Sequence, residues 1–153
     1  MLEVNDITDM NFDIQRFIDA RQGEYIICIF GGAFTQEGKQ YDRPGYFSGI
    51  MYFNGYKKTF DENLKSVKSA NHSMLLGISK MLDSINLQGK SVNILVTTSL
   101  GFLSAQNGSG ANKDIVKEII GKCKALNSKL LVYQWYSGAE QLRSHINSEI
   151  LKD

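Results

Sequence analysis

The chain has 153 residues, of which 42% are hydrophobic and 22% are charged, and its formal net charge is +1. This length and composition favour one globular domain with a single hydrophobic core. They exclude a membrane-spanning protein, because every apolar run is far shorter than a bilayer requires, and no secretory signal pattern opens the chain. The near-neutral charge also lacks the basic excess typical of nucleic-acid-binding domains.

The two cysteines, Cys28 and Cys123, both lie inside apolar patterns. We interpret them as reduced core thiols and expect a cytoplasmic protein. A cysteine-based metal site is not predicted, since the chain has no CxxC pair and only two histidines. We therefore expect no cofactor and no metal.

Residues 1–20 are acidic, with five carboxylates against Arg16, a net charge of −4 that leaves +5 for the remainder. Apolar residues recur at helical spacing over residues 9–21, with Thr8 or Asp9 available as the cap. Gly23 ends this pattern. We therefore predict an acidic helical extension over residues 1–22, ahead of a domain over residues 23–153.

Three consecutive strands are predicted next. Tyr25–Phe34 is an apolar run that ends at a glycine pair, and Gln36–Gly45 is a polar loop with the only proline. Tyr46–Phe53 and Tyr56–Phe60 flank Asn54-Gly55, the strongest short-range signal for a hairpin. The first three strands should therefore form an antiparallel meander.

The second half of the chain alternates between helical and strand patterns. After the polar stretch 61–70, Asn71 can cap a helix with a broad apolar stripe. The pattern then predicts a strand at Val92–Val96, a brief helix to Ala105, a flexible break at Asn107–Gly110, a helix at Lys113–Leu126, a strand at Leu130–Tyr136 and a helix at Ala139–Leu151. Such alternation implies parallel pairing with right-handed crossovers.

Five short motifs stand at the boundaries of these elements: Gly31-Gly32-Ala33, Asn71–Gly77, Val92–Ser99, Gln134–Ala139 and Ile146–Ile150. In this order they resemble motifs of the ribonuclease H family, from about Tyr25 to the end of the chain. The resemblance implies an α/β fold with a mixed five-stranded sheet, three antiparallel strands plus parallel strands, and flanking helices.

The same resemblance implies a chemistry that this sequence does not retain. The family cleaves the RNA strand of an RNA–DNA hybrid with two Mg²⁺ ions, which need a cluster of carboxylates. The four carboxylate positions and the histidine position of the family correspond here to Gly31, Met74, Thr98, Asn147 and Ala139. We therefore expect no catalytic residues, no metal and no nuclease activity of the family type.

Three functions remain open from the sequence. The leading hypothesis is a catalytically inactive protein-binding or assembly module, with a protein partner or self-association through Tyr46, Tyr52, Tyr56 and Phe17. The second is a non-cleaving reader of hybrid or duplex nucleic acid, with a weak phosphate-binding surface of Lys57, Lys58, Lys113 and Lys117. The third is a hydrolase whose site has moved to Asp42, Asp61 and Glu62. No hypothesis involves a membrane.

Overall fold

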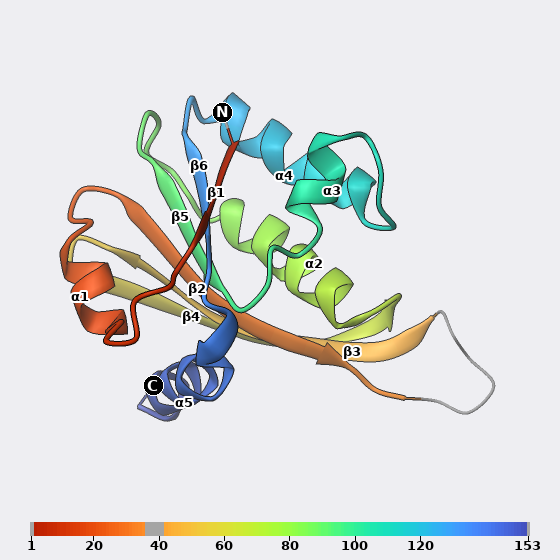
Figure 1. The fold of residues 1–153 in the computed structure, drawn as a ribbon, viewed down its shortest axis with the longest axis horizontal. Coiled ribbons are helices and arrows are strands. Elements are labelled where there is room, and N and C mark those ends of the chain that lie inside the picture. The colour runs from red at the N-terminus through yellow and green to blue at the C-terminus, as the bar shows by residue number, and fades with distance from the viewer. Residues whose placement is uncertain (1, 36–41, 153) are drawn as a thin grey trace.

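A mixed six-stranded sheet, in the order β1-β6-β5-β2-β3-β4, organises the computed structural model, which describes residues 2–35 and 42–152 (Figure 1). In chain order the elements are β1 (Leu2–Asp6), α1 (Ile14–Asp19), β2 (Tyr25–Ala33), β3 (Arg43–Phe53), β4 (Tyr56–Val67), α2 (Ala70–Leu82), β5 (Val92–Val96), α3 (Phe102–Gln106), α4 (Lys113–Ala125), β6 (Leu130–Gln134), the 3-10 turn η1 (Tyr136–Gly138) and α5 (Ala139–Leu151).

The predicted meander is confirmed. Strand β2 pairs antiparallel with β3, and β3 pairs antiparallel with β4. Asn54 and Gly55 both have positive φ, 48° and 84°, as a two-residue hairpin turn requires. The predicted end of the third strand at Phe60 is wrong, because β4 continues through most of the polar stretch to Val67. Phe60 and Leu64 on one side of β4 pack against the core, while charged neighbours face outward. Because of these charged residues, the sequence of this part of the strand is polar overall and was not recognised as a strand.

The N-terminal segment differs from the predicted helical extension. Leu2–Asp6 form β1, which pairs in parallel with β6 and adds a sixth strand at the edge of the sheet. Leu2 and Val4 pack against the core, as alternation in a strand requires. Helix α1 is shorter than predicted, and its cap is Asp13, whose carboxylate accepts a hydrogen bond from the Arg16 N–H at 3.1 Å.

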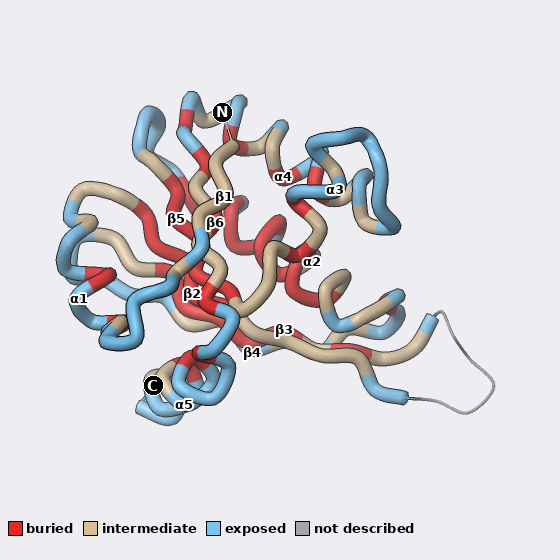
Figure 2. Tube along the Cα trace, viewed as in Figure 1, coloured by how far each residue is buried: buried red, intermediate tan, exposed pale blue. Residues whose placement is uncertain are grey.

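Helices cover both faces of the sheet. Helices α2, α3 and α4 lie on one face, and α1 and α5 lie on the other (Figure 1). Successive residues of β2 alternate between these two cores, with Ile27 and Ile29 toward α2 and Ile26 and Cys28 toward α5. The buried residues concentrate between the sheet and the helices (Figure 2). Both cysteines are free and buried, as predicted.

Helix α2 begins at Ala70, two residues before the start that a cap at Asn71 predicts. Its cap is Ser69 rather than Asn71, with the Ser69 hydroxyl accepting from the His72 N–H at 3.1 Å. The predicted connection Gln36–Gly45 falls partly on residues 36–41, which lie outside the described residues, while Arg43–Gly45 belong to β3. Among the described residues, the helices are all too short or too polar to cross a membrane.

Candidate functional site

The end of β2 brings together the first two of the five positions taken from the family motif. A Cβ atom built on Gly31 would lie 3.2 Å from Cγ of Met74 and 2.6 Å from the backbone oxygen of Tyr46. Met74 is buried on the first turns of α2. The space beside the strand end is therefore filled by a thioether and by backbone, and neither Gly31 nor Met74 has a side-chain oxygen to offer a hard cation.

The remaining three positions lie on other elements. Thr98 follows β5, and its hydroxyl oxygen accepts a hydrogen bond from the Leu100 N–H at 3.3 Å. Ala139 and Asn147 are exposed on α5, whose buried residues are Leu142 and Ile146. Thr98 and Asn147 thus have neutral oxygens, which are weak ligands for Mg²⁺.

An arginine from α5 reaches the end of β2. The guanidinium carbon of Arg143 lies 5.3 Å from the ring centroid of Phe30, the residue before Gly31. Because side chains alternate along a strand, this guanidinium lies on the α5 face of the sheet, opposite to the face where Gly31 meets Met74. Sequence reasoning missed Arg143, because its contact with Phe30 depends on how α5 lies on the sheet.

Tyr46, a predicted partner-binding residue, belongs to a small aromatic cluster. A Cβ built on Gly32 would lie 2.8 Å from Cε1 of Tyr46, so the tyrosine ring covers the glycine. Its centroid lies 6.3 Å from that of Phe30 and 5.6 Å from that of Phe34, which is 51% exposed. The absence of a side chain at Gly32 is what allows the ring to pack flat on the strand.

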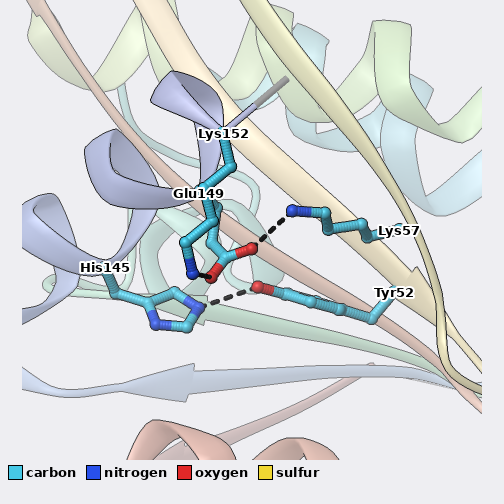
Figure 3. Close-up of polar contacts among 5 residues, drawn as sticks. All are labelled: Tyr52, Lys57, His145, Glu149 and Lys152. Atoms are coloured by element: carbon cyan, nitrogen blue, oxygen red, sulfur yellow. Dashed lines mark hydrogen bonds and ion pairs between the residues drawn. The ribbon is translucent and has the colours of Figure 1, made fainter.

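Two other predicted residues, Tyr52 and Lys57, are engaged within the molecule. The Tyr52 hydroxyl lies 2.8 Å from Nε2 of His145, and Nζ of Lys57 lies 2.5 Å from the Glu149 carboxylate (Figure 3). Lys152 contacts the other oxygen of Glu149 at 3.1 Å. This cluster joins α5 to the β3–β4 hairpin, and it is a structural contact rather than a free binding surface.

The cluster controls the ionisation of its members. Burial, assisted by the nearby Cys28 and Glu149, raises the pKa of Tyr52, which therefore stays protonated. Burial lowers the pKa of His145, with Glu149 opposing that shift and Lys152 and Lys57 adding to it. Nε2 of the neutral imidazole can accept a hydrogen bond from the Tyr52 hydroxyl. Hydrogen bonds from Lys57 and Lys152 lower the pKa of Glu149.

The prediction for Phe17 is wrong. Its ring is buried, at 5% exposure, against Tyr133 at a centroid distance of 5.0 Å, and the Arg21 guanidinium carbon lies 3.7 Å from the Phe17 centroid. The side chain is therefore unavailable to a partner. Tyr56 is 81% exposed, beside the hairpin turn. The apolar helical spacing that suggested a partner surface is explained by packing of α1 on the sheet.

The four predicted lysines do not form one patch. Lys58 donates to Ser84 Oγ at 3.3 Å, beyond the C-terminal end of α2. Lys113 and Lys117 lie in the first half of α4, which runs beside α2 in the same direction, because Ser79 contacts Glu118 and Asp83 pairs with Lys122. By these contacts Lys113 and Lys117 lie beside residues 74–78, in the middle of α2. Lys58 lies past the C-terminal end of α2, and Lys57 pairs with Glu149 of α5 on the other face of the sheet.

The acids of the third hypothesis are also dispersed. Asp61 accepts from Ser48 at 2.8 Å, Asp42 accepts from Ser66 at 3.0 Å, and Glu62 pairs with Lys80 of α2. Asp61 and Glu62 are neighbours in a strand, and so they point to opposite faces of the sheet. Over residues 2–35 and 42–152, no group of three or more histidine, cysteine or acidic side chains is arranged to hold a metal ion. The structure contradicts a site built from these three acids.

Comparison with known proteins finds similarity in structure only. No protein-family model matches the chain, and no curated protein matches it. LC11-RNase H1, in a crystal structure with an RNA/DNA hybrid, has a TM-score of 0.59 at 12% identity, covering 82% of this chain and 95% of that chain. The N-terminal RNase H domain of a Mycobacterium tuberculosis protein has a TM-score of 0.54 at 10% identity, covering 73% of this chain and 86% of that chain.

RNase H1 from the halophilic archaeon Halobacterium salinarum has a TM-score of 0.54 at 8% identity, covering 86% of this chain and 100% of that chain. At these identities the likeness shows the fold alone. The chain therefore has a ribonuclease H-like fold, with the predicted antiparallel meander and parallel strands, and with β1 as an added edge strand.

Proposed function

We propose that this chain is a catalytically inactive ribonuclease H-like protein that acts as a protein-binding or assembly module. The observation that carries the proposal is the packing at the end of β2. Gly31 and Met74 meet there without a side-chain oxygen, and the backbone oxygen of Tyr46 occupies the remaining space beside Gly31. Two Mg²⁺ ions need several oxygen ligands and negative charge, so the residues present do not fit that pair of ions.

Exposed apolar side chains support a binding role. Met10, Tyr56 and Tyr136 are 98%, 81% and 78% exposed, and Phe34 is 51% exposed. Aromatic residues and methionine are enriched at protein–protein interfaces. Removing residues 1–22 would not test such a surface, because the deletion takes away β1 and the buried Phe17. Single substitutions of exposed side chains test the surface without removing parts of the fold.

Catalysis is tested by incubating the full chain with an end-labelled RNA/DNA hybrid in Mg²⁺ and in Mn²⁺. We expect no cleavage above a mock preparation from cells without the gene. Metal-dependent cleavage that follows the protein through two successive columns, and that is absent from the mock, would overturn the proposal.

Binding is tested by placing a photo-crosslinking amino acid at Tyr56 or at Tyr136, with Lys124 on the exposed face of α4 as the matched control position. Crosslinking from both tyrosine positions to a discrete protein or to a second copy of the chain, and not from the control, is the expected result. Equal labelling from all three positions would contradict a dedicated surface.

A second candidate is a nucleic-acid reader that does not cleave. It is favoured by Lys113 and Lys117, which lie one turn apart on α4, near the cleft that Lys68 and His72 line, and one of the similar structures holds an RNA/DNA hybrid. This candidate requires hybrid affinity that falls steeply between about 50 and about 200 mM salt. It also requires weaker binding in Lys113→Ala/Lys117→Ala than in Lys57→Ala/Lys58→Ala. Weak binding that is insensitive to salt would favour the protein-binding module.

A further inference from the structure

A groove of about 600 Å³ separates α1 from α5, on the face of the sheet away from α2. Phe12 and Trp135 form an aromatic floor, with ring centroids 4.6 Å apart, and Trp135 is only 6% exposed. Ser144 and Ser148 line the α5 wall one turn apart. Because these side chains are small, another chain segment can approach the helix closely.

The α1 wall of this groove is acidic. Asp13 lines the groove, and Asp6, Asp9 and Asp19 are exposed on the same stretch of chain, where Arg16 is the only basic residue. Glu140 adds an exposed carboxylate in the first turn of α5. Such a surface attracts a positively charged ligand and repels nucleic-acid phosphates.

Apolar side chains continue beyond the aromatic floor. Met10 is two residues from Phe12 in the chain and 98% exposed, and Tyr136 follows Trp135 and is 78% exposed. An aromatic floor next to an exposed methionine and tyrosine, with a polar rim, has the composition of a protein interface rather than that of a closed pocket for a small molecule.

We propose that the α1–α5 groove binds a basic amphipathic segment of a protein partner. The apolar side chains of the segment pack on Phe12 and Trp135, and its lysines or arginines face Asp9, Asp13 and Glu140. This inference rests on the proposed protein-binding function and assigns it a site and a partner chemistry. The groove lies on the face opposite to Met74, so it is separate from the contact between Gly31 and Met74, although α5 also carries the family positions Ala139 and Asn147.

The test uses the full chain and a fluorescein-labelled peptide of about 15 residues, long enough to form a helix, with leucines on one face and lysines on the other. Fluorescence anisotropy should detect saturable binding that weakens with salt. The same peptide with glutamate in place of every lysine should not bind. Ser144→Trp fills the groove from an exposed helical position and should weaken binding by about tenfold or more. The matched control, Gln106→Trp at the end of α3, should leave binding unchanged.

The charges are tested separately. Asp9→Asn/Glu140→Gln removes two carboxylates while keeping the acceptor that Asp9 offers to the Asn11 N–H, and it should weaken binding. The control Asp42→Asn/Asp114→Asn changes the net charge by the same amount away from the groove, and it should not weaken peptide binding. Equal affinity for wild type, Ser144→Trp and Gln106→Trp, or no binding at all, would overturn the inference. A negative result with the peptide would not change the result of the hybrid-cleavage test. Conversely, cleavage of the hybrid would overturn the proposed function without changing the affinities measured for the peptide.

Discussion

The Tyr52 hydroxyl lies 2.8 Å from Nε2 of His145 and ties the end of β3, beside the hairpin turn, to α5. The charged groups around this imidazole are Glu149 on α5, Lys152 just after α5 and Lys57 on β4. A neutral ring accepts from the hydroxyl and a protonated ring would donate to the hydroxyl oxygen, so the preference for the neutral form comes from burial of the imidazole.

The stability of the fold should therefore depend on pH. Burial lowers the pKa of His145 below its ordinary value of 6.5, so the unfolded chain binds this proton more readily than the folded chain. The contribution is fully present above about pH 6.5 and is lost as the pH falls through the folded pKa. Urea unfolding between about pH 7.5 and pH 5, above the range where Glu149 titrates, should show a falling free energy of unfolding.

Replacing His145 by Gln should flatten this pH dependence. His72 has a pKa lowered by burial and then by Lys68, and it contributes with the same sign, so His72→Gln is the matched comparison. A slope in His145→Gln as steep as that of wild type would contradict the assignment.

Two glycines in helices should respond in opposite ways to alanine. A Cβ on Gly77 of α2 would lie 2.5 Å from Cδ1 of Phe47 and 2.8 Å from Cδ1 of Ile29, whereas a Cβ on Gly121 of α4 meets nothing within 4 Å. Gly77→Ala should destabilise by about 1–3 kcal/mol through overpacking. Gly121→Ala should stabilise by about 0.5–1 kcal/mol through helix propensity. Denaturant titrations measure both, and equal shifts in the two variants would count against the packing described.

Restoring the acids of the family motif should destabilise the fold. The variant carries Gly31→Asp, Met74→Glu, Thr98→Asp and Asn147→Asp together. A side chain at Gly31 collides with the Tyr46 backbone oxygen, and Met74→Glu buries a carboxylate, so we expect a loss of about 1–3 kcal/mol without metal.

Gly31→Ala alone separates the steric cost from the cost of charge. Thermal unfolding in the absence of divalent ions is the measurement. A quadruple variant that melts at the wild-type temperature would show that the site tolerates carboxylates and would contradict this expectation.

Both thiols should be inert in the folded protein. Burial raises the pKa of Cys28 to about 12 and that of Cys123 to about 11, and the thiolate is the reactive form. A thiol reagent at neutral pH should therefore react slowly with the native chain and rapidly in urea. Fast labelling of Cys28→Ala under native conditions would show that Cys123 is more accessible than its 2% exposure indicates.

The sequence predicted most of the fold because its strongest signals are local. The turn at Asn54-Gly55 defined the β3–β4 hairpin, and the apolar stripe of α4 ended within a residue of its predicted end. Strand β1 was missed because five residues give little periodicity and because its partner, β6, is more than a hundred residues away in sequence. The length of β4 was missed because an edge strand carries the same charged residues as a loop.

For the candidate sites, too, the sequence predicted the features that local patterns encode and missed those that depend on the packing of distant elements. The family motif correctly indicated that Gly31 and Met74 lie together, because each stands at the boundary of a recognisable element. The Tyr52–His145 contact and the position of Arg143 at the strand end depend on how α5 lies across the sheet. No local pattern encodes that arrangement, and so these residues were found only in the structure.

The parallel pairing of β1 with β6 has a consequence for synthesis on the ribosome. Leu2–Asp6 and their hydrogen-bonding partners, Leu130–Gln134, are separated by more than a hundred residues of sequence. Until Leu130–Gln134 have been synthesised, the backbone groups of Leu2–Asp6 cannot find these partners and are open to wrong pairing. A nascent chain stalled before residue 130 would therefore hold β1 without its partner strand.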